Sequence, residues 1–170
     1  RRSFQAMRQG FKDLSTVLVT LRQEGVPRVG FFGMSMGSLL AGHVICSDPG
    51  VDFAILTAPA CAPDTILLES EILRRLRRNL DRLGVERQKA ASLWGSVRLD
   101  RRRPAIPSDR ILILAPIHDQ VVPLHEFERL SEAWGRPPIR RLEHGHISVL
   151  AEPRLIDISL EHLRAIGAAP

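Results

Sequence analysis

The chain has 170 residues, of which 44% are hydrophobic, and its formal net charge of +5 is carried almost entirely by arginine. This length is enough for one domain with a sizeable core. The longest uncharged stretch, 29–47, contains His43 and several glycines and serines. It is therefore not the run of about 20 predominantly apolar residues that a membrane span needs. Basic residues without interleaved aromatics argue against a nucleic-acid-binding protein.

The two cysteines, Cys46 and Cys61, lack the spacing of a metal site, and the first residues lack the apolar core of a signal peptide. Two thiols on separate elements are most simply reduced and buried. We therefore expect a cytoplasmic protein whose cysteines bind no metal. Arginines cluster at 74–78 and at 101–103. These clusters fit a solvated helix face and a loop, or surfaces that attract an anionic substrate or a membrane.

Apolar residues at three- and four-residue spacing alternate along the chain with short β-branched runs. The spacing predicts helices over 2–24, 38–46, 65–83, 86–99, 124–134 and 153–166, and strands over 27–32, 51–57, 110–116 and 138–142. Such alternation predicts an α/β fold, in which a parallel sheet of about four strands has helices on both faces.

The pentapeptide Gly33-Met34-Ser35-Met36-Gly37 lies between the first predicted strand and the helix that follows it. A G-x-S-x-G pattern in this context places a serine at the tip of a sharp turn, and the two glycines let strand and helix approach closely. The helix directs its N–H groups toward the place where an oxyanion would form, so the Met36 N–H is a candidate donor. Ser35 is thus a candidate nucleophile, with a plain turn residue as the alternative.

Acidic and imidazole side chains follow two later strands. His118 and Asp119 come after the third predicted strand, and His144 and His146 come after the fourth. Because the carboxyl ends of parallel strands share one edge of the sheet, these groups and Ser35 should lie close together. An imidazole can take the serine proton, and a carboxylate can fix the tautomer of that imidazole.

Two further stretches, 111–123 (ILILAPIHDQVVP) and 140–148 (RRLEHGHIS), together with GMSMG and the order Ser, Asp, His, resemble the α/β-hydrolase superfamily. The resemblance covers nearly the whole chain, with a looser likeness to the branch called α/β-hydrolase domain-containing protein eighteen. It implies a serine hydrolase, a carboxylic ester hydrolase that needs no cofactor and acts on a small or lipid-like acyl substrate.

In the family pattern the catalytic histidine directly follows a glycine, which selects His146 after Gly145. The expected acid is Asp119, with Asp64 as the fallback because some relatives draw the acid from the loop after the second of these strands. Candidate pocket residues are Met34, His118 and His144. Histidines in helical patterns are expected to be structural or exposed: His43, His125 and His162.

The superfamily sheet normally has about eight strands, and the predicted strands match its second half. Residues 1–170 therefore resemble a single, partial domain without the loop that carries the second oxyanion donor. The insert at 61–108 fits either a lid over the acyl site or a plain helical crossover. A first strand at the sheet edge predicts self-association. The alternatives to a hydrolase are a non-catalytic binding module and an acyltransferase on the same fold.

Overall fold

A four-stranded parallel sheet forms the centre of the computed structural model, which describes residues 2–169. Its strands lie side by side in chain order: β1 (Phe31–Met34), β2 (Ala54–Thr57), β3 (Ile111–Pro116) and β4 (Ile139–Leu142). Every neighbouring pair is parallel. The predicted fold class, an α/β protein with a parallel sheet, is confirmed.

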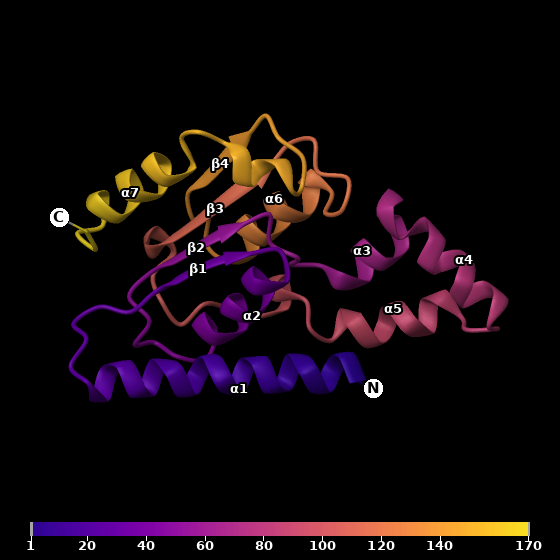
Figure 1. Ribbon diagram of the computed structural model, residues 1–170, viewed down its shortest axis with the longest axis horizontal. Coiled ribbons are helices and arrows are strands. Elements are labelled where there is room, and N and C mark those ends of the chain that lie inside the picture. The colour runs from indigo at the N-terminus through magenta and orange to yellow at the C-terminus, as the bar shows by residue number, and fades with distance from the viewer. Residues whose placement is uncertain (1, 170) are drawn as a thin grey trace.

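Helices cover both faces of the sheet, as the unbroken apolar run of β3 predicts. Ile111, Ile113 and Ala115 pack into a core with residues of α1 (Arg2–Gln23), α2 (Met36–Ile45) and α6 (Leu124–Ala133). Leu112 and Leu114 point the other way, into a core shared with α7 (Leu155–Ala165). Figure 1 shows α1 and α7 on opposite sides of the strands.

The helices between β2 and β3 project beyond the sheet as a separate group (Figure 1). They are α3 (Pro63–Glu69), α4 (Arg74–Arg82) and α5 (Arg87–Gly95). Short 3₁₀ turns occupy Glu71–Leu73, Leu99–Arg101, Ser108–Arg110 and Ser148–Ala151. The predicted helix over 86–99 ends early, at Gly95, whose carbonyl accepts a hydrogen bond from Arg101 Nη1 at 2.9 Å.

The single helix predicted over 65–83 is wrong, because the chain leaves helical geometry at Ser70, where ψ is 124°. The Ser70 hydroxyl donates to the Gln120 carbonyl at 3.1 Å. Arg77 Nη1 donates to the carbonyls of Leu67 at 3.2 Å and Ser70 at 2.6 Å, so a side chain satisfies the carbonyls that the break leaves open. Arg77 is buried and therefore is not part of a solvated arginine face.

The first two strands begin later than predicted, at Phe31 and Ala54. Ahead of them, the Val29 N–H donates to the Asp52 carboxylate at 2.8 Å and the Asp52 N–H donates to the Val29 carbonyl at 2.9 Å. The Asp52 carboxylate thus takes the place of the backbone carbonyl that would accept the Val29 N–H in a regular strand pair. β1 also continues beyond residue 32, because Gly33 lies opposite Leu56 in the register.

Strand β1 lies at one edge of the sheet, as predicted. The side chain of Phe32 on this strand is 55% exposed. Self-association through this edge stays a prediction.

Candidate active site

Ser35 occupies a strained turn between β1 and α2. Its φ of 49° and ψ of −116° lie in a region that L-residues rarely adopt. The Ser35 N–H donates to the Thr57 carbonyl at 3.0 Å, and the Ser35 carbonyl accepts from the N–H of Ala60 at 3.2 Å and of Leu39 at 3.1 Å. Hydrogen bonds from three directions therefore hold the backbone of this serine in place.

The two glycines that flank Ser35 play different parts. A Cβ on Gly33 would come within 2.9 Å of the Ser38 backbone, so only glycine lets β1 and α2 approach this closely. Apart from its chain neighbours and the backbone of its own helix, a Cβ on Gly37 would meet no atom of the described residues within 4 Å. The prediction that both glycines permit close packing is confirmed for Gly33 and is wrong for Gly37.

His146 lies between Ser35 and Asp119, although the three residues come from three separate loops. Its Nε2 is 2.9 Å from Ser35 Oγ, and its Nδ1 is 2.7 Å from Asp119 Oδ2. The His146 side chain is 8% exposed and the Asp119 side chain is fully buried. The loops that carry these residues follow β1, β3 and β4, whose carboxyl ends meet at one edge of the sheet.

The Asp119 carboxylate is held by backbone as well as by the imidazole. Its Oδ1 accepts the N–H groups of Val121 at 2.7 Å and Val122 at 2.8 Å. The carboxylate can only accept, so Nδ1 of His146 carries the ring proton and Nε2 of a neutral ring is an acceptor. The arrangement can therefore move a proton from Ser35 Oγ to His146.

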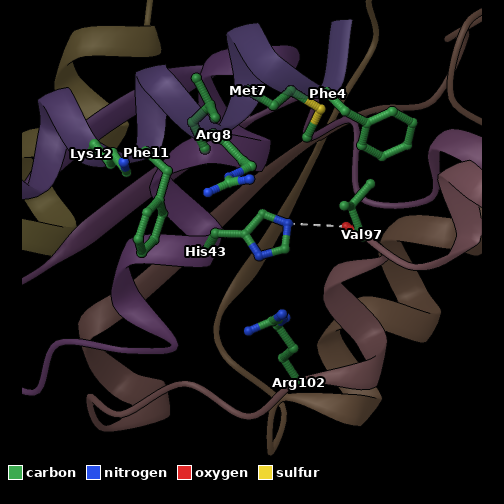
Figure 2. A pocket seen from close by; sticks show the side chains of 9 residues that line it. Phe4, Met7, Arg8, Phe11, Lys12, His43, Val97 and Arg102 are labelled. Carbon is green, nitrogen blue, oxygen red and sulfur yellow. Dashed lines mark hydrogen bonds between the residues drawn. The ribbon is translucent and has the colours of Figure 1, made fainter. Parts of the chain in front are cut away.

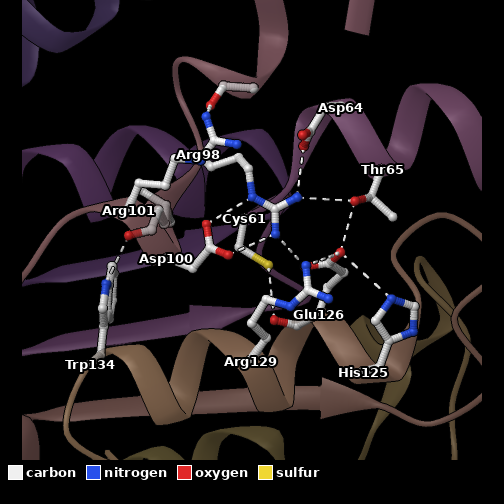
Figure 3. Close-up of polar contacts among 12 residues, drawn as sticks. Cys61, Asp64, Thr65, Arg98, Asp100, Arg101, His125, Glu126, Arg129 and Trp134 are labelled. Atoms are coloured by element: carbon white, nitrogen blue, oxygen red, sulfur yellow. Dashed lines mark hydrogen bonds and ion pairs between the residues drawn. The ribbon is translucent and has the colours of Figure 1, made fainter. Parts of the chain in front are cut away.

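Asp64, the fallback acid, pairs with Arg98 in an ionic cluster (Figure 3), whereas the carboxylate bonded to His146 is that of Asp119. The buried Arg98 guanidinium contacts Asp64 at 2.9 Å, Asp100 at 2.7 Å and Glu126 at 2.8 Å. The hydrogen bond to Asp100 and the surrounding carboxylates raise the pKa of Arg98. Burial is the largest single influence on the Asp100 carboxyl and would raise its pKa, but the hydrogen bond to Arg98 together with the charges of Arg98, Arg129 and Arg101 lowers the pKa overall.

Sequence reasoning missed this cluster because Arg98 is one of many arginines in the chain. The signal that could have found it is the position of Arg98 between Val97 and Leu99, in a stretch that is otherwise apolar. The cluster joins the insert to α6, since Thr65 Oγ1 on α3 also donates to Glu126 Oε1 at 2.8 Å. It is therefore structural rather than part of the site at Ser35.

An apolar cavity of about 230 Å³ opens beside Ser35. The sequence suggests an acyl site beneath the insert but not its walls, because these come from α2 and from the three helices of the insert, whose packing the apolar spacing does not reveal. Its lining residues belong to the turn at Ser35, the loop after β2, the insert and the loop after β3: Ser35, Met36, Ala60, Pro63, Ile66, Leu67, Leu73, Leu76, Trp94 and Val121.

The three candidate pocket residues lie elsewhere. Met34 packs into the core beneath α7. His118 is exposed and lies 3.1 Å from Glu143, and His144 lies 3.0 Å from Glu152. Met36 is the first residue of α2, and no acceptor within residues 2–169 takes its N–H.

Among residues 2–169, no cluster of three or more His, Cys, Asp or Glu side chains could hold a metal ion. Both cysteines are free; Cys61 is buried as predicted, whereas Cys46 is only partly buried. Over the same residues, no helix combines the length and the apolar character needed to span a membrane.

No family model matches the chain. The uncharacterized protein YdjC of Bacillus subtilis is 28% identical over 90 residues, which are 52% of this chain and 78% of YdjC.

Solved structures of hydrolases share the fold. A puromycin hydrolase covers 94% of this chain with a TM-score of 0.70 at 18% identity. An esterase of Pyrococcus furiosus covers 91% with a TM-score of 0.63 at 16% identity, and an acylaminoacyl peptidase of Pyrococcus horikoshii covers 92% with a TM-score of 0.66 at 15% identity. The chain spans 25%, 61% and 28% of these three proteins, respectively. It therefore has the α/β fold of these hydrolases, and its place in the α/β-hydrolase superfamily stays a prediction. The narrower likeness to the branch named above stays a prediction.

Proposed function

We propose that this chain carries the catalytic centre of a serine hydrolase that cleaves a carboxylic ester or a related acyl bond. Ser35 is the nucleophile, His146 the general base and acid, and Asp119 the group that orients His146. One observation carries the proposal: the hydrogen bonds that join Ser35 Oγ, His146 and the buried Asp119 carboxylate. They favour the tautomer in which His146 Nε2 can accept the serine proton.

In the proposed reaction, Ser35 Oγ attacks the acyl carbon while its proton passes to His146 Nε2. The imidazolium that forms is stabilised by the Asp119 carboxylate and gives the proton to the leaving alcohol. Water then repeats the sequence on the acyl-enzyme and restores Ser35. The Met36 N–H, at the N-terminus of α2, supports the oxyanion in both steps. A hydrogen-bond donor of this kind accounts for about 10²–10³ in rate.

The apolar lining of the cavity beside Ser35 supports the proposal that the acyl group of the substrate is apolar. Ile66 and Leu67 of α3 and Leu76 of α4 line the cavity, and none of these side chains could pair with a charged acyl group. We propose that the insert at 61–108 walls the acyl site and, as a lid, excludes water from it.

A fluorophosphonate probe tests the proposal, because it forms a covalent adduct only with an activated serine. Intact and peptide mass spectrometry should place the adduct on Ser35, and His146→Ala should abolish labelling. His144→Ala is the matched control: this imidazole of the same loop is bonded to Glu152 instead, and labelling should persist. A folded protein that takes no label, or takes it equally after His146→Ala, would support a non-catalytic module instead.

A further inference from the structure

A second cavity, of about 360 Å³, lies between α1 and α2 (Figure 2). Helix α1 covers the side of the sheet opposite α7 (Figure 1). The volume of the cavity is within the range of roughly 300–1,000 Å³ that small-molecule sites have. The walls are largely apolar: Phe4, Met7 and Phe11 come from one side of α1, and Leu40 comes from α2. It shares no lining residue with the cavity beside Ser35.

Three cations surround this apolar space: Arg8, Lys12 and Arg102. Arg8 and Lys12 are one helical turn apart on α1, and Arg102 reaches the cavity from the opposite side (Figure 2). No aspartate or glutamate lines the cavity, and none of the three cations forms an ion pair within the described part of the chain. The mouth is therefore positive and uncompensated, which favours an anion.

The imidazole of His43 also lines this cavity, and it is uncharged at pH 7. Its Nε2 lies 3.1 Å from the Val97 carbonyl, and since a carbonyl only accepts, this nitrogen carries the proton. Burial, and then the charge of Arg102, lowers the pKa of His43, so the ring is neutral at pH 7. Nδ1 is then free to accept, and the ring face joins the apolar wall.

We propose that this cavity binds a monomeric amphiphilic anion, such as a medium-chain alkyl carboxylate. Its tail would lie along Phe4, Met7, Phe11 and Leu40, and its headgroup would meet Arg8, Lys12 and Arg102. The two cavities adjoin where the Phe4 ring packs on Trp94, with 4.7 Å between ring centroids. A tail in the second cavity contacts Phe4 and therefore alters the fluorescence of Trp94.

Calorimetric titration of the Ser35→Ala protein with decanoate, below its micelle-forming concentration, tests the proposal. One molecule should bind per chain. Octanoate should bind more weakly, by up to about fourfold for each methylene lost. Decanol and decyltrimethylammonium have the same tail without the negative charge. They should bind at least about tenfold more weakly, because they cannot form the exposed ion pairs with the three cations.

Charge reversal locates the site. Arg8→Glu with Lys12→Glu should weaken decanoate binding about tenfold, and the milder Arg8→Gln with Lys12→Gln should act in the same direction. Arg75→Glu with Arg78→Glu is the matched control, because it makes the same change in net charge on exposed residues of α4 and should leave the affinity unchanged. Circular dichroism verifies the fold of each variant.

Three results would overturn the proposal. One is an absence of decanoate binding. Another is equal weakening by both charge-reversed pairs, which would mean that only the overall charge matters. The last is a loss of affinity in Leu76→Asp but not in Arg8→Glu with Lys12→Glu, which would place the tail beside Ser35.

Discussion

Asp119 and His146 lie 27 residues apart in the chain and are joined by a 2.7 Å hydrogen bond between Oδ2 and Nδ1. The other carboxylate oxygen, Oδ1, is occupied by the N–H groups of Val121 and Val122. Asp119 therefore cannot turn away from His146 without losing two backbone hydrogen bonds. Because these bonds fix the position of Asp119, a substitution that keeps its shape can test whether its negative charge is needed for catalysis.

Asp119→Asn should lower kcat on a short p-nitrophenyl ester about 10⁴-fold. The asparagine amide can donate to His146 Nδ1, which moves the ring proton to Nε2, where it blocks transfer from Ser35. KM should change little, because Asp119 does not line the cavity beside Ser35. Glu143→Gln is the control, since this exposed carboxylate pairs with His118 and its removal should leave kcat unchanged. Equal activity of Asp119→Asn and the parent chain would refute the proposed role.

Gly33→Ala and Gly37→Ala form a matched pair within the turn at Ser35. The new methyl at 33 would meet the Ser38 backbone at 2.9 Å, and a backbone cannot move aside as a side chain can. We expect Gly33→Ala to reduce the free energy of unfolding by roughly 1–3 kcal/mol and to slow fluorophosphonate labelling. Gly37→Ala, in open space within α2, should be neutral or stabilising by up to about 1 kcal/mol. Urea unfolding measures both, and equal effects would contradict the geometry.

Local patterns in the sequence predict much of the sheet and the placement of Ser35, Asp119 and His146. A buried parallel strand such as β3 is recognisable from its own residues, and parallel topology brings the strand ends together without any knowledge of packing. The break at Ser70 could not be predicted in this way. It depends on Arg77 and on the Gln120 carbonyl, which meet Ser70 only in the folded chain.

Local sequence patterns also do not predict the walls of the cavity beside Ser35 or the ionic cluster around Arg98. The role of Asp64 depends on Arg98, 34 residues away, whose buried charge is satisfied by three carboxylates from different elements. Nothing in the local pattern around residue 64 distinguishes an acid that pairs with an imidazole from one that pairs with a guanidinium. Tertiary contacts alone decide this.

Removal of the Arg98 charge should destabilise the fold strongly. Arg98→Met would remove the buried guanidinium from Asp64, Asp100 and Glu126 and leave Glu126 only its longer contacts to Arg129 and His125. We expect a cost of about 3–5 kcal/mol in the free energy of unfolding. Arg74→Met is the control, because Arg74 and Glu71 form an exposed pair at 3.7 Å, and such pairs contribute about 0–1 kcal/mol. Urea denaturation at pH 7 compares the two. A loss no larger in Arg98→Met than in Arg74→Met would contradict the structural role of the cluster.

The low pKa of His43 should make stability depend on pH. Burial and the charge of Arg102 lower this pKa from its ordinary value of 6.5, and the bond to the Val97 carbonyl offsets only part of the shift. Between the folded and unfolded pKa values, the unfolded chain binds a proton that the folded chain excludes. The contribution of His43 to the free energy of unfolding is therefore fully present above about pH 6.5. It is lost progressively as the pH falls toward the pKa of His43 in the folded chain.

His43→Gln tests this dependence, because a glutamine amide can still donate to the Val97 carbonyl but does not titrate. The loss of unfolding free energy between pH 7.5 and pH 5.5, measured by urea denaturation, should be smaller in His43→Gln than in the parent chain. Arg102→Gln should also reduce that loss, since without this cation the pKa of His43 rises toward 6.5. His162 also has a pKa lowered by burial and contributes with the same sign, so the dependence should weaken without vanishing. If the free energy of unfolding depends on pH in both variants as it does in the parent chain, the titration of His43 is not the cause of that dependence.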